Sequence, residues 1–413
     1  MSKKDKKINI IGAGVGGLTA AIVLENAGYA PHIFEKTDRA GGRVKTDVSG
    51  DNLFDHGFQV LLESYPMAKK YLDYTALDLQ QFWPGSVIFE NKKATKFGDP
   101  IRNFNLLFPT IFSQHATLSD KLKVFRLSME LKRQSLDDIF KKRETTTMEY
   151  LQERGFSAVI IHDFFQPFFS GIFLETELNT SSRMFEFVFK MFAEGQASVP
   201  KKGIEAIPKQ LASKLKNSTF HFNVAVTNVD TTGITIEGLP KVKSDCTIVA
   251  TEADELIRNL RNQNLDWKAC NCFYFKAQNK VIHEKLIGLI PGKHHINNLH
   301  YVNSLTGSSS NLLSVTVVDN KGLTGDKLIG KVKEELRHLC GIEVGELKHS
   351  FTIPKALPNL RDIQNEIPST QTQLLDGVFL AGDVTLNGSL NAAMVAGEKA
   401  AQAVLDKIEK KVN

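Results

Sequence analysis

The most constraining feature of this sequence is a short apolar strand that runs through a glycine-rich turn into a helix. Ile8, Ile10 and Ile11 predict a buried strand, and Gly28 is placed to end the helix that begins near Leu18. Between them, residues 12–17 (GAGVGG) have the G-x-G-x-x-G spacing. This order predicts a β-α-β unit whose helix start can face two phosphates.

The glycines of this turn have separate predicted roles. Gly12 permits the tight turn from strand to helix, and Gly14 lets the backbone approach a pyrophosphate closely. Gly17 lets the helix pack against the strand, while Val15 and Gly16 provide the first helical amides. The turn therefore predicts a dinucleotide site, with a plain structural turn as the alternative.

A second strand is predicted at residues 32–35, and it ends in Glu35, followed by Lys36. The Glu35 carboxylate can accept hydrogen bonds from a ribose diol, whereas a 2′-phosphate would meet like charge. Just downstream, Arg39 and Arg43 flank a second glycine pair that includes Gly42. This element adds close backbone approach and positive charge beside the same pyrophosphate, which a simple NAD-binding unit does not need. A basic surface turn is the alternative.

Together, the G-x-G-x-x-G turn, Glu35 and the R-x-G-G-R element resemble the N-terminal signature of the flavin-containing amine oxidase superfamily. That superfamily also includes phytoene desaturase-like and protoporphyrinogen oxidase-like enzymes. The resemblance implies bound FAD, a two-domain fold and oxidation of a C–N or C–C bond. In these relatives a segment similar to residues 54–60 passes close to the flavin ring, so Gly57 and Phe58 are expected to contact it. His56 is a candidate base; the alternative is that an Asp simply holds it in place by a hydrogen bond.

A second signature stands near the other end of the chain. Residues 376–383 predict a short buried strand that ends in Gly382 and Asp383, and a helix with apolar residues at helical spacing follows. Asp383 can bond the ribityl chain or the phosphate region of the flavin. Ser389, Leu390 and Asn391 lie at the helix start, whose amides can stabilise negative charge at the pyrimidine end. This run resembles the C-terminal FAD motif of the same superfamily.

The resemblance also suggests contacts from the middle of the chain. Val226 is expected to contact the adenine through its backbone. In amine oxidases a Lys on a strand of the substrate domain holds a water against flavin N5. Lys268 is a candidate for that role, but Cys270 occupies the expected place. This departure puts simple amine oxidation in doubt and favours desaturation, isomerisation or another flavin chemistry. No Cys or His stands where relatives attach flavin covalently, so we expect noncovalent FAD.

Composition limits the remaining possibilities. A chain of 413 residues with 42% hydrophobic content can bury the cores of two domains. The net charge of +5 is small, and no basic-aromatic repeat indicates nucleic-acid binding. The chain lacks an apolar run of roughly 18 residues and a signal-peptide pattern, so we expect a cytoplasmic protein. Its four cysteines are too few for a disulfide framework, and no cysteine-histidine spacing predicts a metal site.

We predict an α/β, Rossmann-like FAD-binding domain assembled from discontinuous segments, with an α+β substrate-binding domain of a mixed sheet and helices. The FAD-binding domain comprises residues 1–75, 200–265 and 370–413, and the substrate-binding domain comprises 76–199 and 266–369. Strands are expected at 246–251, 271–276 and 312–318, a hairpin joins 220–226 to 233–237, and a helix is expected at 326–339.

The substrate domain contains two apolar stretches of interest. Phe residues are densest between 164 and 192, where some rings could line an apolar substrate cavity and the rest would pack in the core. Pro109 is expected to interrupt any helix in 103–112. Leu122, Phe125, Leu127 and Leu131 indicate an amphipathic helix, which we expect to pack on its own domain, with peripheral membrane contact as the alternative.

These features predict an FAD-dependent oxidoreductase that takes a hydride from an apolar or amphipathic molecule such as a polyene, a tetrapyrrole precursor or a lipophilic amine. One alternative is a non-catalytic protein that binds lipids or prenylated proteins on the same fold, as Rab GDP-dissociation inhibitors do. Another is an NAD-dependent Rossmann enzyme. The substrate, the electron acceptor and the oligomeric state stay open.

Overall fold

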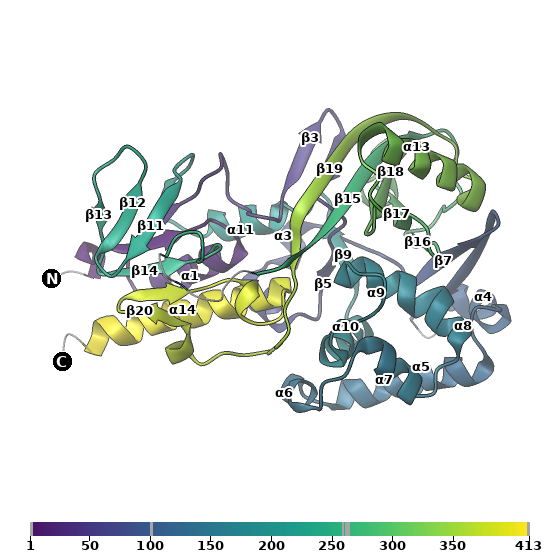
Figure 1. The fold of residues 1–413 in the computed structure, drawn as a ribbon, viewed down its shortest axis with the longest axis horizontal. Helices are drawn as coiled ribbons and strands as arrows, with labels where there is room; N and C mark the ends of the chain where they lie inside the picture. The colour runs from purple at the N-terminus through teal and green to yellow at the C-terminus, as the bar shows by residue number, and fades with distance from the viewer. Residues whose placement is uncertain (1–2, 100–101, 258–259, 261–264, 411–413) are drawn as a thin grey trace.

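The structure is a computed structural model that describes residues 3–99, 102–257, 260 and 265–410. Its first sheet has six strands in the order β10-β2-β1-β14-β21-β20 (Figure 1). Pairing is parallel except between β20 and β21. The strands are β1 (Ile8–Ile11), β2 (His32–Phe34), β10 (Thr219–His221), β14 (Cys246–Val249), β20 (Gln373–Leu375) and β21 (Val378–Leu380). Three distant segments of the chain therefore build one sheet, as predicted.

Two helices from opposite ends of the chain cover one face of this sheet. Helix α1 (Val15–Asn26) lies beside α14 (Leu390–Lys410), as the purple and yellow ribbons of Figure 1 show. The other face packs against the three-stranded sheet β11 (Val226–Asp230), β12 (Gly233–Ile236) and β13 (Val242–Lys243). Covered on both faces, β1 and β14 are buried along their whole length, which explains their continuous apolar sequences.

The predicted hairpin needs correction. Residues 219–221 pair in parallel with β2, and the strand that joins β12 in the hairpin is β11, which begins only at Val226. The apolar run from Phe220 to Val226 is therefore divided between two sheets. Its alternation alone could not show this division, because both halves have the same period.

The second large sheet is mixed, as predicted, with the order β19-β15-β18-β17-β16-β7-β8. Only β16 and β7 pair in parallel. The strands are β7 (Gly85–Glu90), β8 (Lys93–Gly98), β15 (Trp267–Ala277), β16 (Ile287–Leu289), β17 (Ile296–Tyr301), β18 (Leu312–Val317) and β19 (Val344–Pro358). Helix α13 (Gly325–Glu335) continues as a π-helical turn to Cys340, and its apolar residues pack on this sheet.

A group of helices forms the remaining part of the molecule, at the lower right of Figure 1. It contains α5 (Leu118–Arg133), α6 (Leu136–Lys141), α7 (Thr147–Glu153), α8 (Ala158–Ile160), α9 (Gln166–Phe173) and α10 (Ser182–Glu194). A π-helical turn at Ile161–Phe165 joins α8 to α9. Five rings of the Phe-rich stretch form its core: Phe165, Phe169, Phe173, Phe185 and Phe187.

Two predictions in this region are partly wrong. Helix α4 (Leu107–Phe112) contains Pro109, which does not interrupt it because the third helical position needs no N–H donor. The amphipathic helix exists as α5, but only Leu127 and Leu131 of its four predicted apolar residues are buried. Leu122 and Phe125 are exposed.

Shorter elements connect these parts. They are β3 (Thr46–Ser49), β4 (Asn52–Asp55), β5 (Leu61–Leu62), β6 (Leu79–Gln81), β9 (Ala197–Pro200), α2 (Pro66–Tyr71), α3 (Tyr74–Leu77), α11 (Ala206–Ser213) and α12 (Asn303–Thr306). Among the described residues, no helix combines the length and the apolar character needed to cross a bilayer.

Candidate functional site

One large cavity, of about 690 Å³, lies between the parallel sheet and the mixed sheet. The first group of lining residues comes from the carboxyl ends of β1, β2, β14 and β21 and from the starts of α1 and α14. The second group comes from β15, β18, β19 and α9. Ligands of open α/β sheets bind outside the carboxyl ends of the strands, so the first group is the expected place for a dinucleotide.

Most of the predicted cofactor-binding residues line this cavity. They are Gly12, Gly14, Val15, Gly16, Glu35, Lys36, Gly42, Arg43, Gly57, Phe58, Val226, Gly382, Asp383, Ser389 and Leu390. Gly17, Arg39 and Asn391 are not among its lining residues. Glu35 and Asp383, from opposite ends of the chain, thus face the same cavity, as a shared nucleotide site requires.

The start of α1 is suited to bind phosphate. Its N-cap is Gly14, no side chain caps the helix, and no acidic residue lies in the first turn. A Cβ at Gly14 would meet no atom within 4 Å, whereas one at Gly17 would lie 2.1 Å from the Gly12 carbonyl oxygen. Gly17 therefore fixes the helix against the strand end, and Gly14 leaves the helix start open to the cavity. The first helical amides and the positive end of the helix dipole can thus meet a pyrophosphate.

Glu35 has a second role that the motif did not indicate. Its buried carboxylate accepts hydrogen bonds from the Ala13 N–H at 2.9 Å and from the Thr37 N–H and hydroxyl at 2.9 and 2.8 Å. Glu35 therefore holds the glycine-rich turn against the end of β2. A carboxylate has about four lone-pair sites and three are occupied here, so about one site remains for a hydrogen bond from a ribose hydroxyl.

The two arginines of the R-x-G-G-R element have different surroundings. The Arg43 guanidinium forms an ion pair with Asp383 and lies 5.2 Å from the Trp267 ring centre, so it links the two signatures. The Arg39 guanidinium instead donates to Glu205 at 3.0 Å and to Asp47 at 2.6 Å. Arg39 thus ties the glycine-rich loop to the start of α11 and to β3.

The two candidate catalytic residues also differ in position. His56 lines the cavity; its Nε2 lies 3.0 Å from Asp47 Oδ2, and its ring lies 4.2 Å from that of Phe351. Asp47, and not the adjacent Asp55, holds it. The Lys268 ammonium donates to Glu175 and Thr180, each at 3.0 Å, and Lys268 does not line the cavity.

Cys270 does line the cavity, on β15 opposite β19. Burial raises the pKa of its thiol to about 12, so the side chain is a neutral thiol at ordinary pH. A neutral thiol is a weak hydrogen-bond donor and cannot position a water as a lysine ammonium would.

The wall formed by the mixed sheet and α9 is largely apolar. Its side chains include Ile172, Leu174, Phe351 and Ile353. From the Phe-rich stretch Gly171, Ile172 and Leu174 line the cavity, and none of its rings does, so the expectation that rings of this stretch line it is wrong. Those rings point into the helical core, where burial of their area stabilises the domain. Residues 351–357 of β19 form much of the wall, and no sequence motif indicated them.

Three neutral polar groups lie on neighbouring strands beside this wall. Thr316 lines the cavity and pairs in register with Asn298, and His300 lies two residues further along β17. All three side chains are buried, and within the described part of the chain Thr316 Oγ1, Asn298 Oδ1 and His300 Nδ1 have no hydrogen-bond partner. Burial lowers the pKa of His300 to about 3, so the imidazole is uncharged.

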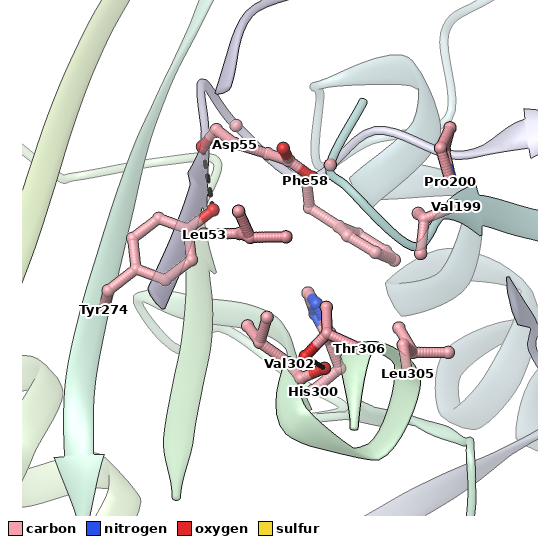
Figure 2. A pocket seen from close by; sticks show the side chains of 12 residues that line it. Leu53, Asp55, Phe58, Val199, Pro200, Tyr274, His300, Val302, Leu305 and Thr306 are labelled. Atoms are coloured by element: carbon pink, nitrogen blue, oxygen red, sulfur yellow. Dashed lines mark hydrogen bonds between the residues drawn. The ribbon is translucent and has the colours of Figure 1, made fainter. Parts of the chain in front are cut away.

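A second, small cavity of about 20 Å³, large enough for one water, shares Gly57 and Phe58 with the large one. Figure 2 shows the Phe58 ring between Asp55 and His300, with the Tyr274 hydroxyl donating to the Asp55 carbonyl at 2.8 Å. Burial raises the pKa of the Asp55 carboxyl to about 6, although the Thr46 hydroxyl and the Ile204 N–H both donate to it.

A glycine-rich turn and strand ends that face one cavity define a dinucleotide-binding protein, and the apolar wall opposite adds room for a second ligand. The family model for flavin containing amine oxidoreductases matches residues 15–405, so the chain belongs to this family.

Individual relatives share shorter segments with the chain. An L-amino acid oxidase from Crotalus durissus cumanensis is 31% identical over 168 residues, which are 38% of this chain and 33% of that protein. A hydroxysqualene dehydroxylase from Sinorhizobium fredii is 38% identical over 68 residues, 16% of each chain. The chain thus matches about a third of the length of the first of these curated relatives. The solved structure of a CLA-producing fatty acid isomerase from P. acnes has a TM-score of 0.71 at 16% identity, covers 97% of this chain and 99% of its own, and shares the fold.

Proposed function

We propose that the chain binds FAD noncovalently and uses it to oxidise or desaturate an apolar or amphipathic small molecule. The observation that carries this proposal is the single cavity with a nucleotide-type wall on one side and an apolar wall on the other. When bound, FAD supplies the acceptor for a hydride from the substrate.

The residues of the nucleotide-type wall fit FAD. The open start of α1 would hold the pyrophosphate, and the remaining acceptor site of Glu35 would take a hydrogen bond from the adenosine ribose. Asp383, oriented by Arg43, would bond the ribityl chain or the phosphate region. The amides of Leu390 and Asn391 at the start of α14 would face the pyrimidine end of the flavin, where negative charge develops on reduction, while the Ser389 hydroxyl caps the Ala392 amide at 3.0 Å.

The opposite wall favours a substrate without charge. The carboxylates that line the cavity are Glu35, Glu252, Glu255 and Asp383. Lys355 pairs with Glu252 and Glu255, and Arg43 pairs with Asp383, so no described carboxylate is placed among the apolar side chains to receive a substrate ammonium. The Thr316 hydroxyl, which has no partner within the described residues, can hydrogen-bond a substrate hydroxyl or carbonyl without requiring charge. The names of the dehydroxylase and the fatty acid isomerase also denote lipophilic compounds.

The chain's own residues have three tasks in this reaction. The apolar wall excludes water, which protects the hydride transfer and strengthens hydrogen bonds inside the cavity. Gly57 and Phe58 limit the space between the two walls. His56, held by Asp47 at 3.0 Å, is the described imidazole that lines the large cavity, and it can accept a proton released from the substrate.

The test begins with the purified protein, which should absorb at about 450 nm and release all its FAD into the supernatant after heat denaturation. The holoprotein is then mixed anaerobically with a polyene, an unsaturated fatty acid, a reduced tetrapyrrole and a lipophilic amine. We expect one of the first three to bleach the absorbance. Bleaching by the amine alone would contradict the proposed substrate class. A colourless protein that takes up no FAD would favour a non-catalytic lipid-binding protein.

A further inference from the structure

The exposed apolar side chains of this protein gather in one region of the chain. Ten large apolar side chains are exposed in the described part, and seven of them fall between residues 104 and 159. We call these seven the apolar patch: Phe104, Phe112, Leu118, Leu122, Phe125, Met129 and Val159. Phe112 and Leu118 are 78% and 76% exposed, so water covers them almost fully. Single exposed apolar residues are ordinary, but a gathered group marks an interaction surface.

Helix α5 provides the centre of the apolar patch. Leu118, Leu122, Phe125 and Met129 follow each other at spacings of four, three and four residues. At about 100° per residue these four side chains fall within about 60° of arc, on one stripe of the helix. The residues that α5 buries, among them Leu127 and Leu131, lie on the opposite side. The helix therefore has two apolar faces, and the fold uses only one of them.

Other members of the apolar patch lie on elements at the same end of the molecule as α5. Asp120, in the first turn of α5, accepts hydrogen bonds from the N–H and the hydroxyl of Ser157 at 2.9 and 2.7 Å. Ser157 is the N-cap of α8, which carries Val159. Figure 1 shows α4, α5 and α8 at the same end of the molecule.

Positive charge borders the stripe on both sides. Arg126 and Arg133 lie on one flank and Lys132 on the other, at about 100° per residue. The two acids of α5 are used within the protein, since Asp120 is buried and Glu130 pairs with Arg154. An apolar stripe flanked by cations is complementary to a bilayer surface, where the stripe enters the acyl boundary and the cations meet anionic headgroups.

The patch also connects to the large cavity through the backbone. Helix α8, with Val159, continues through the π-helical turn into α9. Gly171 and Ile172 of α9 line the cavity. One continuous helical segment therefore joins the apolar patch to the apolar wall of the large cavity.

We propose that the apolar patch docks this protein on the surface of a lipid bilayer that contains anionic lipids. Phe104, Phe112 and the α5 stripe enter the boundary between headgroups and acyl chains. Arg126, Lys132 and Arg133 bind the headgroups. Docking depends on these exposed side chains and does not rest on the flavin reaction.

Vesicle sedimentation of the full chain tests this proposal. We expect the protein to sediment with phosphatidylglycerol vesicles and to sediment less with phosphatidylcholine vesicles. We also expect 1 M salt to release it, because the Debye length is then about 3 Å and the headgroup charges are screened. The double variant L122S/F125S should lower the partition coefficient by on the order of tenfold or more, because each apolar side chain that enters the bilayer contributes to it. The double variant V48S/L239S, which removes exposed apolar side chains outside the patch, should leave it unchanged.

Circular dichroism and the flavin spectrum verify that each variant folds. Equal sedimentation of the two double variants would overturn the proposal, and so would no sedimentation with either lipid. A concentration-dependent dimer in light scattering that L122S/F125S dissolves, without vesicle binding, would instead assign the apolar patch to contact between two copies of the chain. The vesicle result is independent of whether any substrate bleaches the flavin, so failure of one proposal is distinguishable from failure of the other.

Discussion

The contact between α1 and α14 yields a prediction whose sign is the opposite of what helix propensity alone indicates. Gly397 lies inside α14, where replacing Gly by Ala ordinarily stabilises a helix by about 1 kcal/mol. Here a Cβ would lie 2.2 Å from the Gly16 carbonyl oxygen, 3.0 Å from its carbonyl carbon and 3.2 Å from its Cα. All three are backbone atoms, so no rotamer change can relieve the overlap.

The expected cost follows from this geometry. Ordinary contact begins at 3.4 Å, so the two helices must separate by about 1.2 Å (3.4 minus 2.2). Overpacking of a fitted core costs about 1–3 kcal/mol, and an overlap with rigid backbone belongs at the upper end. After the gain in helix propensity, Gly397→Ala should destabilise the protein by about 2 kcal/mol. Because the starts of both helices line the large cavity, flavin should also bind more weakly.

Thermal unfolding followed by circular dichroism measures this effect. The matched control is Gly330→Ala in α13, where a Cβ would meet no atom within 4 Å, so only helix propensity acts. We expect the midpoint to fall for Gly397→Ala and to rise slightly or stay constant for Gly330→Ala. If both substitutions raise the midpoint, α1 and α14 do not approach each other as closely as described, and the packing of the N-terminal segment on the C-terminal helix is refuted.

Three further predictions concern individual side chains. Asp383→Asn removes the charge that pairs with Arg43 and should weaken flavin retention on gel filtration by on the order of tenfold. The control Asp376→Asn changes an exposed carboxylate and should have no effect on flavin retention. Burial raises the pKa of the Asp55 carboxyl from 3.8 to about 6. Between these two pH values the carboxyl is protonated in the folded protein and ionised in the unfolded chain. Stability should therefore fall by up to about 3 kcal/mol as pH rises from about 4 to about 6, and thermal melts of Asp55→Asn should lack this slope. The buried Cys270, with its pKa raised to about 12, should resist alkylation by iodoacetamide at pH 8 in native protein and react after denaturation, as mass spectrometry would show.

The nucleotide-type wall could be predicted because its information is local. A strand, a glycine-rich turn and a helix start within a few residues leave little choice of geometry, and the same holds for Gly382, Asp383 and the start of α14. The difference between Arg39 and Arg43 was not predictable, although both belong to one motif. It depends on Glu205, which packing of α11 brings to Arg39.

Apolar stretches showed the limit of sequence patterns more clearly. The density of Phe between residues 164 and 192 indicated burial, but whether a ring meets the core or a cavity depends on the neighbouring element. In α5 the periodicity predicted a helix, yet it could not distinguish the face packed on the fold from the exposed stripe. Both faces are apolar, and the sequence does not show which of them is exposed to solvent.

The sequence by itself determined the local geometry of two distant signatures, because glycine conformations, helix dipoles and strand ends act over a few residues. Only the tertiary structure decided how the second wall of the cavity is built. Residues 351–357 of β19, Cys270 of β15 and Gly171 of α9 are far apart in the chain, and they meet because a mixed sheet and a helical core bury their apolar surfaces together. The physical reason is that the hydrophobic effect has no directional preference. The pattern of apolar residues in the sequence therefore indicates which side chains are buried but not which of them contact each other.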